Sequence, residues 1–400
     1  MTTLSAGLGH STAKNANGAV KEAVGAALSA LEGKPPGLAF VTATVDYDAD
    51  LVHRTLREEL PGVPIHGVTT SLGVLGSKGV TTGAHGAVGV LLLGAAEGIL
   101  FAVGGSELGD DPTAAGRRAA QAVARAVPNP AVLLFNGSPG AEEDVLEGVA
   151  SVLPGVRAYG GSAADHAIAG EWRVFMNDAV ASNALSLAAI GGDVRVGCAF
   201  VVPYEPLGEE ATVTRSEGRR IATLSDRPAA EVLREWVGAG IDDQARHGGA
   251  ILTQTALNPL GIRLSEASQE HFVTLHPAQI QAEGAVDLFA RAGEGTTVCR
   301  MCTTEDALVI ALSQVMDRAL ADGGLTAEQV KAAVLIYCAG CAGALGPRLH
   351  DGLKERLGGP WADVPLLGLC TFGEQGHVPG VGNVHANLSL GVVLFGDGPA

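Results

Sequence analysis

One pattern of apolar and polar positions occurs three times along the chain. Each copy starts with a short apolar strand, continues with an amphipathic helix, reaches a second strand that ends in small residues, and closes with an alternating strand. In the last copy these segments lie at residues 333–338, 345–357, 365–371 and 385–396. Uninterrupted apolar runs are typical of strands covered on both faces, whereas alternation indicates one polar face. The pattern predicts α/β units with parallel and antiparallel pairing.

The same order of segments is present twice more in the first half of the chain. The segments lie at residues 131–136, 141–153, 158–162 and 183–191 in the middle copy, and at residues 38–42, 50–60, 64–70 and 87–94 in the first. These copies are too widely spaced for a solenoid of short repeats. We therefore expect internal repeats that form a few large units.

A strand and a helix precede each unit. We place these leading pairs at residues 5–11 and 19–31, at 99–105 and 112–127, and at 297–303 and 307–321. Superposing the units makes two sets of strand-end residues equivalent: His10, Gly105 and Cys302, and Thr42, Asn136 and Cys338. The predicted fold class is α/β, with mixed parallel and antiparallel sheets built from repeated β-α-β-α-β-β units in two packed halves.

The segment from residue 194 to residue 294 departs from this pattern. It carries two strand signals, a helix that starts at Pro228, and a looser stretch over residues 242–269. Pro and Gly interrupt the strands at residues 204–208, which favours a domain boundary there. We therefore divide the chain into halves 1–205 and 206–400. We expect the halves to pack directly on each other, because no low-complexity linker separates them.

Composition narrows the class of protein. Of the 400 residues, 47% are hydrophobic and 17% are charged, which suits a large folded interior and opposes disorder. The formal charge of −17 opposes nucleic-acid binding, because phosphates require basic patches. We find neither an apolar run long enough for membrane insertion nor a signal-peptide pattern. The expected location is the cytoplasm, with reduced cysteines.

Short motifs follow one another along most of the chain. They are GLGHST at residues 7–12, YGGSAAD at 159–165, Val-Thr at 213–214, Pro-Ala at 228–229, Cys-Ala-Gly at 338–340, Phe-Gly-Glu at 372–374 and His-Ala-Asn at 385–387. In this order they resemble the FIST family of bacterial sensory domains, with its FIST N and FIST C parts. The chain departs from the family pattern at Cys341, where an Arg is common.

The resemblance implies a small-molecule-binding sensor protein in signal transduction. Its ligand would be an amino acid or a related metabolite, and a separate signalling output protein would be its partner. Some members of the family resemble haem-binding nitric oxide sensors, so a haem sensor is an alternative. Axial ligand candidates near predicted corners are His10, His166, His350, His377 and His385. The absence of CxxCH excludes covalent haem, and an aromatic content of 4% disfavours a haem pocket.

Polar side chains gather where the strands of the last unit end, and open α/β sheets bind their ligands at strand ends. Glu374 offers a carboxylate for an ammonium group, while the other side chains and free backbone N–H groups suit a carboxylate. We predict six ligand-binding residues: Cys338, Cys370, Thr371, Glu374, His385 and Asn387. The plainer interpretation is strand-end hydrogen bonding without a ligand.

Two CxxC pairs, Cys299/Cys302 and Cys338/Cys341, have the spacing of zinc ligands. The first pair lies on a predicted strand, where residues three apart point to opposite faces. Cys341 is expected in a loop beyond Cys338. We therefore predict no metal site. A redox dithiol would require the thiols to lie at a helix N-terminus.

Catalysis has little support in the sequence. Ser162, Asp165 and His166 are too close together for a triad, and a nucleophile elbow is absent. We therefore expect binding rather than turnover and assign no catalytic residue. The enzyme alternative uses Cys370 or Glu374 in the predicted ligand cavity.

Overall fold

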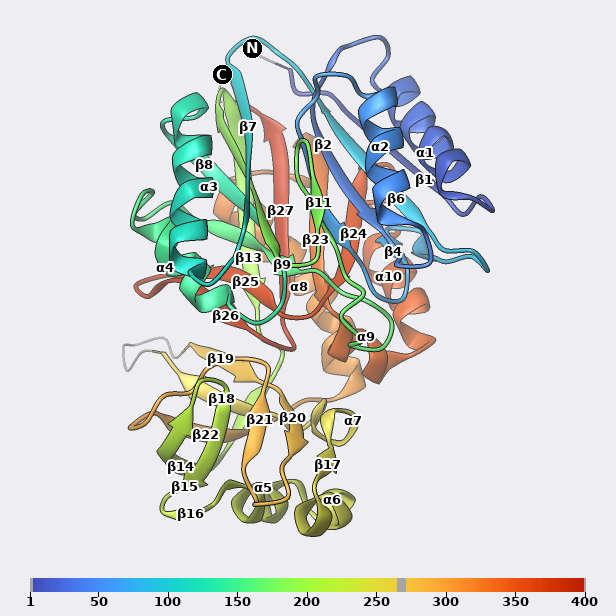
Figure 1. Cartoon of the computed structure of the whole chain (residues 1–400). Coiled ribbons are helices and arrows are strands. Elements are labelled where there is room, and N and C mark those ends of the chain that lie inside the picture. Colours follow the sequence, from blue (N-terminus) through green and yellow to red (C-terminus); the bar gives the residue numbers. More distant parts are fainter. Residues whose placement is uncertain (1–2, 265–270, 399–400) are drawn as a thin grey trace.

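The computed structural model describes residues 3–264 and 271–398, and within them the α/β class is confirmed. The core holds three six-stranded mixed sheets, and a fourth sheet forms a separate layer below them (Figure 1). Each core sheet has the same order of its first four strands, in which the last two are parallel and the others antiparallel.

The strands and helices of the three units correspond one to one. The first unit has β1 (Ala6–Ser11), α1 (Ala16–Ala30), β2 (Pro36–Ala43), α2 (Ala49–Glu59), β3 (Ile65–Thr69) and β6 (Val88–Gly94). The second has β7 (Ile99–Glu107), α3 (Pro112–Ala126), β8 (Pro130–Gly137), α4 (Glu142–Ala150), β9 (Ala158–Ser162) and β12 (Ala184–Gly192). The third has β13 (Val194–Val201), α8 (Glu305–Gly323), β23 (Val330–Cys338), α9 (Ala339–Leu345), α10 (Arg348–Leu357), β24 (Leu366–Thr371) and β27 (Leu390–Asp397), with a 3-10 turn at Ala327–Gln329.

Each core sheet is completed by a hairpin from another unit. The first unit gives β4 (Val74–Gly76) and β5 (Gly79–Thr81) to the third sheet, beside β24. The second gives β10 (Val174–Phe175) and β11 (Val180–Ala181) to the first sheet, and the third gives β25 (Glu374–Val378) and β26 (Gly382–Ala386) to the second. This cyclic exchange gives the core a pseudo-threefold arrangement in which no unit is complete alone.

The three sheets bury their inner faces against one another. Phe40, Leu134 and Val334, at equivalent positions of the three units, share one hydrophobic cluster. Helices cover the outer faces, with α1 and α2, α3 and α4, and α8 to α10 each closing a cluster of their own. Of the helices in the described residues, none is both long and apolar enough to cross a membrane.

The leading strand of the third unit is β13, so its placement at residues 297–303 is wrong. A Cβ at Gly7 of β1 would lie 2.0 Å from the carbonyl oxygen of Ala27 in α1, and one at Gly197 of β13 would lie 2.1 Å from that of Ala319 in α8. The same close approach of strand and helix, which only glycine allows, identifies β13 as the equivalent of β1. The expected helix over 307–321 lies within α8.

Backbone hydrogen bonds also correct the alignment of the strand ends. Ala39, Leu133 and Ala333 each donate to the residue before the neighbouring parallel strand, namely Pro64, Arg157 and Pro365. Counting from these positions makes Ile336 the equivalent of Thr42 and Asn136. Cys338 therefore lies two residues beyond that position. In each unit the closing strand pairs with both the leading strand and the second strand. Traced across it, Thr42 leads to His10, Asn136 leads to Gly105, and Ile336 leads to Phe200. The equivalent of His10 and Gly105 is therefore Phe200 and not Cys302.

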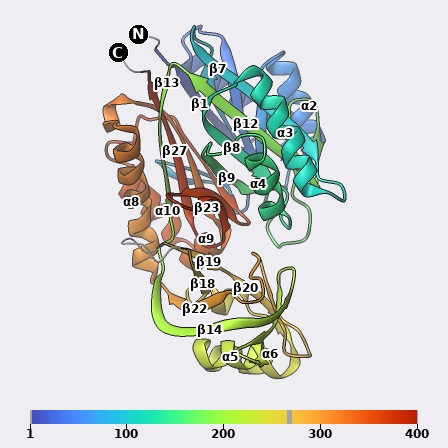
Figure 2. The same ribbon diagram turned by 90° about the vertical axis from the view of Figure 1, so that its left-hand side faces the viewer.

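An inserted domain separates β13 from α8 in the sequence. The strand directly before α8 belongs to this domain, and for that reason it was taken for the leading strand. It contains β14 (Glu205–Glu217), β15 (Arg220–Leu224), β16 (Arg227–Pro228), β17 (Gly249–Ala250), β18 (Leu260–Arg263), β19 (Phe272–Leu275), β20 (Pro277–Ile280), β21 (Val286–Leu288), β22 (Thr297–Cys302), α5 (Ala229–Val237), α6 (Asp242–His247) and α7 (Leu252–Thr255), with a 3-10 turn at Ala239–Ile241. The domain has its own hydrophobic cluster and joins the core through β14 and β22 (Figure 2). The looser stretch expected over residues 242–269 carries short elements, and residues 265–270 lie outside the described part.

Candidate functional site

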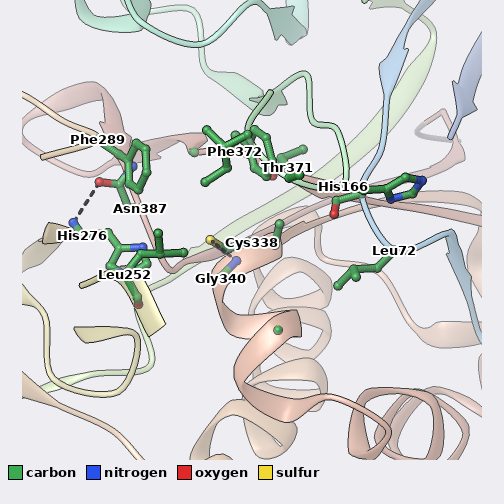
Figure 3. A pocket seen from close by; sticks show the side chains of 16 residues that line it. Leu72, His166, Leu252, His276, Phe289, Cys338, Gly340, Thr371, Phe372 and Asn387 are labelled. Carbon is green, nitrogen blue, oxygen red and sulfur yellow. Dashed lines mark hydrogen bonds between the residues drawn. The ribbon is translucent and has the colours of Figure 1, made fainter. Parts of the chain in front are cut away.

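A cavity of about 290 Å³ lies where the three units meet the inserted domain (Figure 3). We call it the axial cavity. The loops after β3, β9 and β24 line it, together with the start of α9 and three residues of the inserted domain, Leu252, His276 and Phe289. These ends of parallel strands are the expected place for a ligand in an α/β sheet.

A ring of backbone hydrogen bonds holds the three loops together. The N–H of Ser71 donates to the carbonyl of Cys370 at 3.2 Å, and that of Phe372 donates to Ser162 at 3.0 Å. The N–H of Ala164 completes the ring by donating to Thr69 at 2.9 Å. Each unit thus positions the loop of the next, and the cavity depends on all three.

Apolar side chains at the rim of the cavity are partly exposed and strained. Leu72 and Ile168 are 43% and 40% exposed, with φ angles of 62° and 56°. A left-handed backbone is costly for residues other than glycine and rare for a β-branched residue. Such strain is commonly found where a protein holds a ligand.

Thr371 lines the cavity, while Glu374 is fully buried behind it. The Thr371 hydroxyl lies 2.7 Å from Oε1 of Glu374, and Oε2 accepts from the backbone N–H and hydroxyl of Ser389 at 3.1 and 2.9 Å. Burial, followed by the nearby Cys338, raises the pKa of Glu374 well above its usual range. Burial therefore favours the protonated form of this carboxyl, which orients Thr371 rather than pairing with a ligand cation.

Asn387 lines the opposite side of the cavity. Its Oδ1 accepts the backbone N–H of His276 at 3.0 Å, as Figure 3 shows. Burial lowers the pKa of His276 to about 4, so the imidazole is neutral and donates from Nε2 to the carbonyl of Leu252 at 2.8 Å. With its oxygen occupied, Asn387 offers its NH₂ group to a ligand.

The structure does not bring Glu374, His385 and Asn387 to one cavity. His385 lies on β26, which belongs to the second sheet, and faces α4. Its Nδ1 is 3.1 Å from Nε2 of Gln375, and its Nε2 is 3.2 Å from the carbonyl oxygen of Phe289. Asn387 lies beyond the end of β26 and turns towards the inserted domain instead.

The cysteines lie in different parts of the fold, except that Cys338 and Cys341 share the first turn of α9. Cys338 lines the axial cavity, whereas Cys370 is fully buried on the helix side of β24. Cys341 lies in α9, so its expected place in a loop is wrong. Cys299 is buried with its Sγ 3.5 Å from the carbonyl oxygen of Gly261. Of the six predicted ligand residues, Cys338, Thr371 and Asn387 line the axial cavity, and ligand binding by all six stays a prediction.

Charged residues between α4 and the inserted domain were missed in the sequence. Arg219 Nη2 lies 2.6 Å from Glu142 and 2.5 Å from Glu143, and Glu142 also accepts from the Ser162 hydroxyl at 2.6 Å. Burial alone would raise the pKa of Glu142, but His385 and Arg219 outweigh it and lower this pKa. Glu142, Glu143 and His385 are close enough together for a metal ion, yet both carboxylates already pair with Arg219. The sequence carries no signal for a network between segments so far apart.

Comparisons with known proteins identify the family of the chain. A search of curated proteins finds no match to the chain. A crystal structure of cyanuric acid hydrolase from A. caulinodans is similar at 11% identity, covering 99% of this chain and 100% of that one, with a TM-score of 0.36, which is too low to support an argument. The FIST N domain matches residues 37–227 and the FIST C domain matches residues 229–377. FIST domains are sensory domains that bind small ligands in signal transduction, and this chain belongs to the FIST family.

Proposed function

We propose that this protein senses a small molecule that occupies the axial cavity. The observation that carries the proposal is the meeting of three strand-end loops and the inserted domain around one mostly apolar cavity. A ligand there would contact every unit of the core and the inserted domain at once. It would thereby favour one relative position of these parts, which a separate output protein in the cytoplasm would recognise.

The proposed ligand is an amino acid or a related metabolite with an apolar body. Thr371, Cys338 and the Asn387 NH₂ group supply a short polar edge, while Leu252 and Phe289 supply apolar walls. No carboxylate is among the described lining residues, so a buried ammonium group would lack a charged partner. Among amino acids and related metabolites, this favours one whose nitrogen is acylated or absent.

Thermal-shift screening of such metabolites tests the proposal. A specific ligand at 100 times its dissociation constant adds about 2.7 kcal/mol to stability. Thr371→Val removes the cavity hydroxyl at nearly constant volume and should weaken binding. Ser106→Ala, which removes a half-buried hydroxyl of β7 that does not line the cavity, is the control. A Soret band in the visible spectrum of the purified protein would instead favour the haem alternative.

Recovery of the ligand tests binding against turnover. The bound metabolite should be released chemically unchanged after prolonged incubation. Conversion that Cys370→Ala or Glu374→Gln abolishes while binding persists would establish the enzyme alternative.

A further inference from the structure

The N-terminus of α9 carries two cysteines in one turn. Cys338 is the N-cap residue, with φ −63° and ψ 130°, and Cys341 is the third residue of the helix. The Sγ of Cys338 accepts the backbone N–H of Gly340 at 3.3 Å. This is the arrangement of a capping side chain folded over the first turn of its helix.

Such a turn suits a disulfide. Cα atoms three residues apart on a helix are about 5 Å apart, within the roughly 4.4–6.8 Å that a disulfide requires. The other CxxC pair of the chain has the same spacing on strand β22. There, residues three apart are separated by about 10 Å and point to opposite faces. Cys299 and Cys302 therefore form a natural control for Cys338 and Cys341.

Access to the two thiols is unequal. Cys338 lines the axial cavity, and Figure 3 shows its sulfur there beside Gly340. Cys341 lies behind it, fully buried, with its Sγ 3.6 Å from the hydroxyl of Tyr204 at the entrance to the inserted domain. A reagent that enters the cavity meets Cys338 first and reaches Cys341 only through it.

We propose that Cys338 and Cys341 form a redox-active dithiol that is oxidised by small disulfides entering the axial cavity. The Cys338 thiolate attacks one sulfur of the disulfide R–S–S–R, forming a mixed disulfide and releasing one thiolate, which takes up the proton that Cys338 lost. The Cys341 thiolate then attacks the Cys338 sulfur, closes the intramolecular disulfide and releases the second R–SH. Two electrons and two protons pass from the protein to the small disulfide.

Oxidation of this pair would change the surroundings of Tyr204. The Cys341 sulfur moves towards Cys338 and away from Tyr204, which also donates to the carbonyl of Ala256 at 2.7 Å. Tyr204 lies where the chain passes from β13 to β14. The redox state of the pair thus acts on the junction between the core and the inserted domain. This inference does not depend on which metabolite the cavity binds.

The rate of oxidation should depend on pH. Burial raises the pKa of the Cys338 thiol well above its usual range, so the thiolate is a minor species at neutral pH. Below that pKa the thiolate fraction rises about tenfold for each unit of pH. The oxidation rate should follow the same slope, whereas an exposed thiol with an ordinary pKa would level off near pH 9.

Peptide mapping of the wild-type protein tests the proposal directly. The folded protein is incubated with bis(2-hydroxyethyl) disulfide, quenched in acid, alkylated and digested with trypsin. Cys338 and Cys341 fall in one peptide, residues 332–348, whereas cleavage after Arg300 separates Cys299 from Cys302. We expect peptide 332–348 to lose one pair of hydrogens and to regain them with dithiothreitol, with no cross-link between the peptides of the control pair.

Two variants separate the roles of the thiols. Cys341→Ala should stop at the mixed disulfide on Cys338, and Cys338→Ser, which keeps a polar N-cap, should leave Cys341 unmodified. Far-UV circular dichroism and melting curves verify that both variants are folded. An unmodified peptide 332–348 in the folded wild type, or a disulfide from either residue to Cys370, would overturn the proposal.

Discussion

Glu374 and Glu142 are two buried carboxyl groups whose surroundings shift their pKa values in opposite directions. Replacing Glu374 with Gln keeps the shape of the side chain, and the amide can form the hydrogen bonds to both Thr371 and Ser389. Because the folded pKa of Glu374 lies above the ordinary value of 4.5, the unfolded chain releases this proton first as pH rises. The wild type therefore loses stability above pH 4.5, by about 1.4 kcal/mol per pH unit, until the folded pKa is reached.

The Glu374→Gln variant removes this loss. It should be close to the wild type in stability at pH 4 and increasingly more stable than the wild type as pH rises above 4.5. Urea unfolding from pH 4 to pH 8 measures the difference. A variant that is less stable than the wild type by the same amount at every pH would refute the neutral Glu374.

Glu142→Gln is the matched control with the opposite sign. The pKa of Glu142 is lowered, so its ion pair stabilises the fold above pH 4.5 and is lost as pH falls through the folded pKa. This variant should be less stable than the wild type at pH 7, and the deficit should shrink at low pH. The two glutamates thus test the same physical argument in both directions.

Other features of the structure lead to three more predictions. Arg219→Leu should destabilise the protein by about 3–5 kcal/mol in urea unfolding, because it leaves two glutamates without their partner, whereas Arg220→Leu, at an exposed pair with Asp287, should change little. The fragment 1–204 should not melt cooperatively, since β13 and the β4–β5 hairpin lose the strands they pair with, and a soluble monomeric fragment with a sharp transition would contradict this. Elemental analysis should find far less than one zinc per chain, and one tightly held zinc would show that the thiols bind metal.

Long periodic segments were readable from the sequence, and short ones were not. The helix predicted at 112–127 agrees with α3 because it has one clear apolar face, and the strand predicted at 131–136 agrees with β8 because it is an apolar run buried on both faces. The exchanged hairpins have strands as short as two residues, as in β10, which are too short to show a period. Their partners lie in other units, so local sequence could not reveal the exchange.

The direction in which side chains point at strand ends also could not be predicted from the sequence. Glu374 and Thr371 were correctly placed at one corner, but burial of the carboxyl behind the hydroxyl depends on Ser389 from another strand. The walls formed by His276 and Phe289 come from the inserted domain, where no pattern pointed to a site. The CxxC motif at residues 338–341 showed that two cysteines lie three residues apart, but it did not indicate that a helix begins there.

The exchange of hairpins between units has a consequence for how the protein is made. On the ribosome, the β4–β5 hairpin emerges early, yet Leu75 pairs with Gly368, which is synthesised much later in the chain. Until then β4 has an unpaired edge, the type of surface through which nascent chains associate wrongly. Such distant pairing also makes closure of the fold slow. A chain truncated before β24 would therefore lack both the partner strand of β4 and the Thr371 wall of the axial cavity.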